Sequence, residues 1–187
     1  MIKRRAPREP APRTVDNIED WYAEFLENNE TTTEELDSFA RLADVDSEFT
    51  DMLAMDYLAM TTMLVEHENT SVVTLSYVME VVSEDWKKAA YVLQAIAAKP
   101  EITVEILASL FQHGDRYVRE MVVGHTNVPI DILIDAARDK KEFVRARLTY
   151  DNPKVPDEAL QYLADNDPET YIRFSAIEEL NRRGQLH

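Results

Sequence analysis

A fixed spacing in the second half of the chain constrains its fold more than any other feature. An aliphatic residue followed by Arg occurs three times, and a Val-Leu pair stands one spacing before the first of them. The successive separations are 26, 26 and 28 residues. A period of this length indicates an array of short structural units that stack on one another. The recurring pairs are Val92-Leu93, Val118-Arg119, Val144-Arg145 and Ile172-Arg173.

A second series keeps the same step and predicts two short helices in each unit. Thr103, Pro129 and Pro156 each stand four residues before a Leu, so that each begins an apolar helical stripe. Such short helices are stable only when stacking buries their apolar faces in a shared core. We therefore expect an all-α fold, a right-handed HEAT-like α-solenoid over 71–187, with 71–98 as a degenerate first pair. The expected first helices are 103–112, 129–138 and 156–164, and the expected second helices are 116–123, 142–149 and 168–183.

Helices are also expected before the periodic region. Residues 14–70 show no such period, and we expect an acidic helical region there with helices over 18–27, 31–43 and 49–65. Thr31 or Thr32, with Glu34 or Glu35 three residues later, has the spacing of a capping box. A helix is expected over 72–82, and Ser83 is expected to cap the next, over 86–98.

Charge is distributed unevenly along the 187 residues. The net charge is −16, but residues 14–86 hold 19 acids and one base, whereas 87–187 are nearly balanced. An acidic body repels a phosphate backbone, which argues against general nucleic-acid binding. The chain has no cysteine, which excludes disulfides and thiolate metal sites. No apolar run approaches the length needed to cross a bilayer, so we expect a cytoplasmic protein or a component of a virus particle.

The first 13 residues are basic and rich in proline, which favours an extended conformation. Two interpretations remain open. The segment is either a flexible tail or an arm that docks on the acidic surface of a neighbouring subunit. The cations of this candidate arm are Lys3, Arg4, Arg5, Arg8 and Arg13.

The periodic residues resemble a known family. The pattern of an aliphatic-Arg pair, Asn-x-Pro or Asn-Pro, Leu, Ala-x-Asp and a second aliphatic-Arg pair is similar to the leucine-rich repeat variant, a two-helix solenoid with HEAT-like style. The resemblance covers about 91–183 and implies a binding surface rather than an activity. That family's cysteine-ligated iron–sulfur cluster has no counterpart here. The residues that carry it best are Val144, Arg145, Asn152, Pro153, Pro156, Leu160, Leu163, Ala164, Asp165, Asp167, Ile172 and Arg173.

The recurring arginines have two interpretations. They could form a basic row that grips an anionic partner. Alternatively, each guanidinium could bond a carboxylate and free carbonyls at the mouth of a neighbouring turn, so that Asp and Arg tie one unit to the next. We favour the second hypothesis. The residues of this Arg–Asp series are Arg119, Arg145, Arg173, Asp115, Asp139 and Asp165, with Asp167 as an alternative to Asp165.

Motifs for catalysis or metal binding are missing from the sequence. The four histidines lack metal-ligand spacing, and no nucleotide-binding glycine loop or nucleophile motif occurs. We therefore expect no catalytic residue, no metal and no cofactor. The function expected is that of a non-enzymatic adaptor or structural subunit in a larger assembly, for example a phage particle. Its partners would be proteins, among them copies of itself. The alternative is an acidic inhibitor whose carboxylates mimic the phosphates of a nucleic acid.

Overall fold

The computed structural model describes residues 24–42, 56–150 and 154–184, and these residues are entirely helix and connecting loop. The protein is therefore all-α in this part of the chain, as the sequence predicts. The helices are α2 Thr33–Leu42, α4 Asp56–Glu66, α5 Val72–Val82, α6 Ala90–Ala98, α7 Val104–His113, α8 Arg116–Val123, α9 Ile130–Ala136, α10 Glu142–Arg147, α11 Asp157–Asn166 and α12 Thr170–Arg182, with a 3₁₀ turn η2 Ser83–Asp85.

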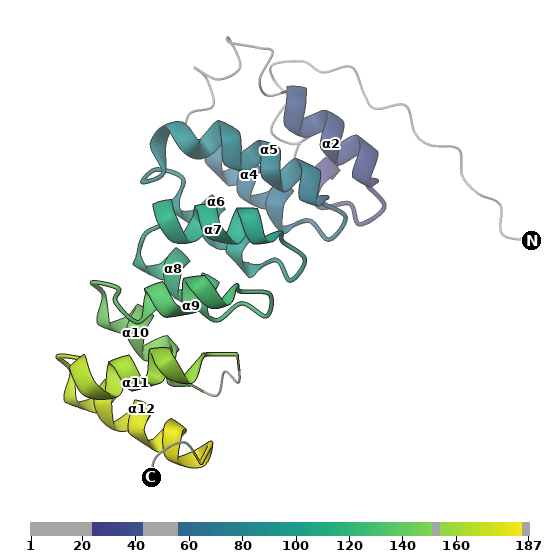
Figure 1. The fold of residues 1–187 in the computed structure, drawn as a ribbon. Coiled ribbons are helices and arrows are strands. Elements are labelled where there is room, and N and C mark those ends of the chain that lie inside the picture. The colour runs from purple at the N-terminus through teal and green to yellow at the C-terminus, as the bar shows by residue number, and fades with distance from the viewer. Residues whose placement is uncertain (1–23, 43–55, 151–153, 185–187) are drawn as a thin grey trace, which may run out of the picture.

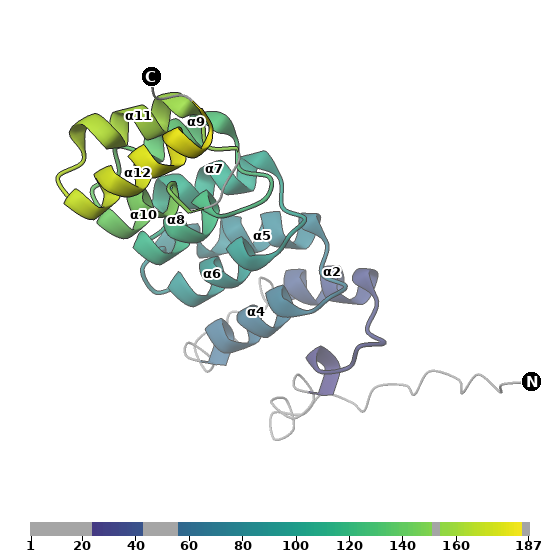
Figure 2. The same cartoon turned by 90° about the horizontal axis from the view of Figure 1, so that it is seen from below.

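Successive helices alternate between two rows that run the length of an elongated molecule (Figure 1). One row, called here the α7 row, consists of α2, α5, α7, α9 and α11, and the other, the α8 row, consists of α4, α6, α8, α10 and α12. Within the α8 row, α6 packs on α4 and α8, and α8 packs on α10. Across the rows, α7 packs on α8 and α11 on α12. Figure 2 shows the two rows side by side when the molecule is viewed from below.

One apolar core runs through the stack of helix pairs. Each pair, one helix from the α7 row and its neighbour from the α8 row, is called a layer. The core runs without a break from Leu26 and Leu36, through Leu75 and Leu93, to Leu180. The aliphatic residues of the recurring pairs are its centre, since Val92, Val118, Val144 and Ile172 are fully buried. Burying such side chains is worth about 1.5–3 kcal/mol each, which explains how helices of six to thirteen residues are held.

The described part of the acidic N-terminal region belongs to this same core. Helix α2 packs on α5, and α4 packs on α6, in the arrangement that the later helices repeat. Leu64 and Val65 of α4 are buried in contact with the common cluster. The change in sequence pattern near residue 70 is therefore no boundary in the packing of the described residues.

Side-chain caps explain several helix starts. The capping box is confirmed for one of the two expected pairs: the amide of Thr32 donates to Oε2 of Glu35 at 2.8 Å, and the amide of Glu35 donates to Oγ1 of Thr32 at 3.3 Å. Thr103 caps α7 by accepting from the amide of Ile106. Asp115 caps α8 by accepting from the amides of Tyr117 and Val118.

Two predicted boundaries are wrong. Ser83 does not cap an α-helix over 86–98: its hydroxyl donates to the carbonyl of Glu80 at the end of α5, it begins the 3₁₀ turn η2, and α6 starts only at Ala90. The last helix begins at Thr170 rather than at residue 168, because Asp167 is committed to a side chain of the preceding layer. Most of the helices expected over 18–27 and 49–65 lies outside the described residues, although 24–26 and α4 are helical.

The described helices are all too short or too polar to pass through a lipid bilayer.

Candidate interaction surface

Arginine and aspartate join neighbouring helix pairs along the side of the molecule where the chain passes from each α7-row helix to the next α8-row helix (Figure 1). Nε of Arg119 donates to Asp139 at 2.6 Å, and Nε of Arg145 donates to Asp167 at 2.7 Å. Each guanidinium makes a second bond to the same carboxylate at 3.1 Å. The bond to Asp167 raises the pKa of Arg145. These forked pairs are the geometry in which Arg binds a carboxylate most strongly.

Each arginine of the series also bonds a carbonyl. Nη1 of Arg119 donates to Gly114 at 2.8 Å, and Nη1 of Arg145 donates to Asp139 at 2.8 Å. Arg173 donates to the carbonyls of Asp167 and Pro168 and to the hydroxyl of Thr170, with no carboxylate among its bonds in the described residues. The guanidinium groups therefore satisfy carbonyls left free between helices.

The structure corrects three members of the expected Arg–Asp series, the first being Arg173, whose bonds go to carbonyls and a hydroxyl. Asp165 is exposed, and it accepts both its bonds from Gln161 of the same helix. The paired residue is Asp167, whose side chain is fully buried. Asp115 does not pair with an arginine of the series, because its carboxylate caps α8. The connection before α12 brings Asp167, rather than Asp165 two residues earlier, against the guanidinium of Arg145.

A second set of bridges, missed in the sequence, joins the connections at the other end of the helices. Nε2 of His125 lies 2.9 Å from the carbonyl of Lys99, and Nδ1 accepts from the amide of Asn127 at 3.0 Å. His67 repeats this arrangement, with the carbonyl of Asn28 at 3.2 Å and the amide of Asn69 at 3.1 Å. Because Nδ1 accepts in both residues, Nε2 carries the proton and donates. The pattern His-x-Asn, which occurs at 67–69 and at 125–127, is the feature of the sequence that could have indicated these bridges.

Cationic side chains extend these bridges along the same end. Nζ of Lys99 donates to the carbonyls of Glu66 and His67 at 3.0 and 2.7 Å, and burial lowers its pKa. Lys154 donates to the carbonyl of Thr126. Arg183 donates to the carbonyl of Val155 at 2.6 Å. These residues therefore hold layers together and are poor candidates for a ligand site.

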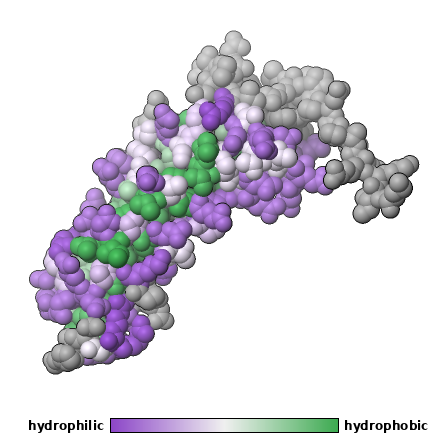
Figure 3. Space-filling model, turned by 45° about the vertical axis from the view of Figure 1, so that its right-hand side comes forward, coloured by the Kyte–Doolittle hydropathy of each residue, from purple (hydrophilic) through white to green (hydrophobic). Residues whose placement is uncertain are grey.

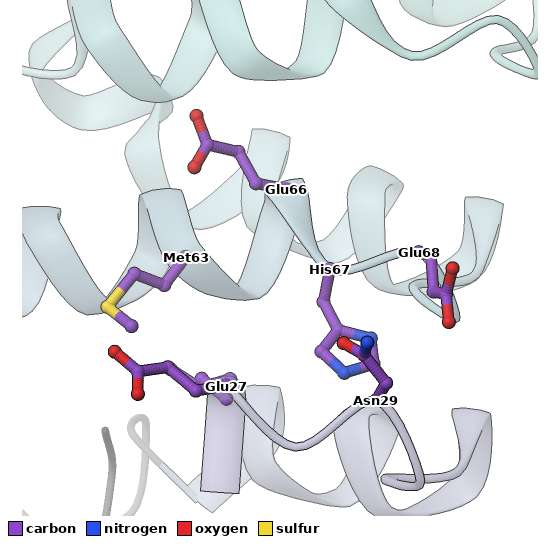
Figure 4. Close-up of a pocket in the computed structure, with 7 residues that line it drawn as sticks. Glu27, Asn29, Met63, Glu66, His67 and Glu68 are labelled. Carbon is purple, nitrogen blue, oxygen red and sulfur yellow. The ribbon is translucent and has the colours of Figure 1, made fainter. Parts of the chain in front are cut away.

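A shallow pocket of about 330 Å³ lies between the end of α4 and the segment before α2. It is lined by Leu26, Glu27, Asn29, Met63, Glu66, His67 and Glu68. Figure 4 shows the ring of His67 pointing across to the segment that carries Asn29. Both ring nitrogens of His67 are engaged by backbone groups, so the pocket offers neither a free imidazole base nor a metal ligand there.

Exposed aromatic side chains recur at one position of the α8 row. Each occupies the second residue of its helix, directly before the buried aliphatic residue. Their exposed fractions are 79, 49, 48 and 45 %, which is high for aromatic residues of a folded chain. The equivalent positions place them in line on successive helices. We call this the aromatic row: Tyr91 on α6, Tyr117 on α8, Phe143 on α10 and Tyr171 on α12.

A shared cation joins two neighbouring rings of the aromatic row, those of Tyr117 and Phe143. The guanidinium of Arg116 lies over the ring of Tyr117, 4.3 Å from its centre, and over that of Phe143, 5.3 Å from its centre. Farther along, burial and the carboxylate of Glu142 raise the pKa of Tyr171. A cation over an aromatic face is an attractive contact.

Aliphatic residues are exposed on the α7 row as well. Val73, Val104 and Ile130, near the starts of α5, α7 and α9, have exposed fractions of 58, 51 and 60 %. Figure 3 shows hydrophobic surface in a band along the molecule between hydrophilic margins. Exposed apolar side chains gathered in one patch mark interaction sites more often than scattered ones do.

Other expectations fall outside what the structure describes. The candidate arm with Lys3, Arg4, Arg5, Arg8 and Arg13 lies outside the described residues. Among the residues that are described, no group of three or more His, Asp or Glu side chains is placed to hold a metal ion.

Comparison with models of protein families, with curated proteins and with solved structures finds no match to this chain. The resemblance to the leucine-rich repeat variant therefore stays a prediction from its residues.

Proposed function

We propose that this protein is a non-enzymatic helical-repeat adaptor, a HEAT-like α-solenoid that binds another protein along its α8 row. The observation that carries the proposal is the aromatic row. Four large, exposed rings stand at the same position of successive helices, directly outside buried residues of the core. Aromatic residues are enriched at protein–protein interfaces, and Tyr is among the residues that most often dominate the binding energy.

The rigidity of the scaffold supports the same function. Both ends of the middle layers are fixed by bonds between layers, Arg145 to Asp167 at one end and His125 to Lys99 at the other. A preorganised surface loses little conformational entropy on binding. The recurring Arg–Asp pairs and His bridges thus hold the scaffold together. The aromatic row, which recurs with the same period, stays free to bind a partner protein.

The distribution of acids favours the adaptor over an acidic mimic of a nucleic acid. A mimic needs carboxylates in a regular row. Helices α2, α7, α9 and α11 of the α7 row carry an acid in the first turn, but α5 carries none. First-turn acids also have an ordinary structural cause, since they stabilise the helix dipole.

Site-specific photocrosslinking tests this function. A benzoylphenylalanine is placed at Tyr117 or Phe143, and at Val104 or Ile130 of the α7 row as matched exposed controls. Irradiation in the producing cells should join a defined protein to positions 117 and 143 and not to the controls. Equal crosslinking at all four positions, or none at 117 and 143, would contradict binding through the aromatic row.

A further inference from the structure

Three cations lie beside the middle of the aromatic row. Lys140 and Lys141 precede α10, and Arg116 begins α8. Both lysines are exposed, and neither has an ion pair among the described residues.

The nearby acids explain why these cations stay unpaired. Asp139, next to Lys140, is held by both nitrogens of the Arg119 fork. Asp115, next to Arg116, accepts hydrogen bonds at one carboxylate oxygen from the amides of Tyr117 and Val118 at the start of α8. Asp139 and Asp115 are therefore used for the internal structure of the molecule and form no ion pair with Lys140, Lys141 or Arg116.

Apolar and positive groups are interleaved at this place. The guanidinium of Arg116 lies over the rings of Tyr117 and Phe143, and Phe143 itself follows Lys141 by two residues. A partner that covers the rings must also meet the cations. The matching chemistry is a segment that carries carboxylates next to apolar side chains.

We infer that the stretch of the aromatic row from Tyr117 to Phe143, with Arg116, Lys140 and Lys141, binds an acidic peptide segment with aromatic or aliphatic anchors. This inference rests on the proposed function and adds the chemistry of its partner. A peptide is favoured over a nucleic acid because the acidic body of the protein repels a dense row of phosphates, whereas a few carboxylates can face the cations alone.

Selection from a phage-displayed library of random short peptides tests the inference. The bait is the full-length protein, and the counter-selection uses the variant Tyr117→Ala/Phe143→Ala. Peptides retained only by the wild type should be rich in Asp and Glu next to Phe, Leu or Trp. Retained peptides that are neutral or basic would overturn the inference and leave the proposed function standing. The absence of any peptide that distinguishes the two baits would overturn both.

Charge variants then test the role of the lysines on the best selected peptide. Lys140→Gln/Lys141→Gln should weaken its binding about tenfold, measured by fluorescence anisotropy, and added salt should reduce that difference. The matched control, Ser76→Glu/Ala108→Glu, changes the net charge equally at exposed positions of the α7 row and should bind as the wild type does. Equal weakening by both variants would show that only net charge matters and would overturn the assignment to this place. Tighter binding of an oligothymidylate than of every selected peptide would also overturn it, in favour of a nucleic acid.

Discussion

At the residue scale, the role of a recurring side chain is decided by what its polar atoms meet. Arg145 has three bonds to Asp167 and the carbonyl of Asp139, and its side chain is 9 % exposed. An arginine so enclosed cannot grip a second anion. The recurrence of Arg119 and Arg145 in the sequence thus reflects a repeated contact between layers.

Replacing Arg145 by Ala leaves the buried carboxylate of Asp167 without its counter-charge. Loss of one partner of a buried pair costs about 3–5 kcal/mol, and the melting temperature should fall by on the order of 10 °C. Arg173→Ala is the matched control, because Arg173 bonds carbonyls and a hydroxyl, and it should cost less. Differential scanning calorimetry checks both. An unchanged melting temperature for Arg145→Ala would contradict this structural role and favour the interpretation in which the arginines bind an anionic partner.

Glu179 gives the stability of the last helix a defined pH dependence. Bonds from Arg182 and then Arg183, set against burial, lower its pKa from 4.5 to about 2. A carboxyl whose pKa is lower when folded stabilises the protein above 4.5, and this contribution is lost as the pH falls toward 2. Glu179→Gln should therefore cost about 1–2 kcal/mol near neutral pH and progressively less below about pH 4. Urea unfolding of both proteins across this range measures the difference, and a difference that does not change with pH would contradict the assignment.

At the element scale, the connections between helices help the core to hold neighbouring helix pairs together. Gly114 closes α7 against α8, and a methyl group there would stand 2.5 Å from the carbonyl oxygen of Leu110 and from Cγ1 of Val118. Neither a helix carbonyl nor a fully buried valine can move freely. The tight turn therefore requires glycine for space, since its φ of −64° is open to any residue.

The bridge made by His125 can be tested at the same scale. His125→Ala removes the donor to the Lys99 carbonyl and the acceptor of the Asn127 amide, both in a buried setting. We expect a loss of about 1–3 kcal/mol and faster hydrogen exchange in 99–102 and 125–128. The control is His113→Ala, because His113 is exposed and stacks on Trp86. Exchange that stays slow in both connections of His125→Ala would show that the bridge is dispensable.

The sequence predicts elements best where the apolar period and a local cap agree. Helices α5 and α8 lie where they are expected, because the buried stripe of α5 and the Asp115 cap of α8 are both local features. The start of α6 is mispredicted because a Ser before a helix and a Ser that closes one look the same in sequence. The His bridges are missed since their partners are carbonyls, whose positions only the fold determines. The sequence shows an aromatic residue directly before the aliphatic residue of each recurring pair. It does not show that these aromatic side chains are exposed.

At the scale of the whole molecule, the residues that hold the structure differ from those that we propose for binding, although both sets recur with the same period. The core, the Arg–Asp pairs and the His bridges hold the layers in line (Figure 1). The aromatic row and its neighbouring cations face outward on that scaffold. A change to one set should therefore leave the other property largely intact.

The candidate arm is tested by deleting residues 1–13, which carry a net charge of +4. If the arm joins copies of the protein, the truncated protein should have a smaller mass by light scattering and an unchanged melting temperature. Identical masses for the full-length and truncated proteins would favour the flexible tail.

The most direct test of the whole account combines partner capture with thermal melting for the variant Tyr91→Ala/Tyr117→Ala/Phe143→Ala/Tyr171→Ala. The control variant is Val73→Ala/Val104→Ala/Ile130→Ala on the α7 row. Full-length proteins are used as baits, and recovered proteins are quantified by mass spectrometry. The account predicts that the aromatic-row variant melts near the wild-type temperature and loses, at least about tenfold, a partner that the control variant retains. Undiminished recovery of every partner by the aromatic-row variant would contradict it.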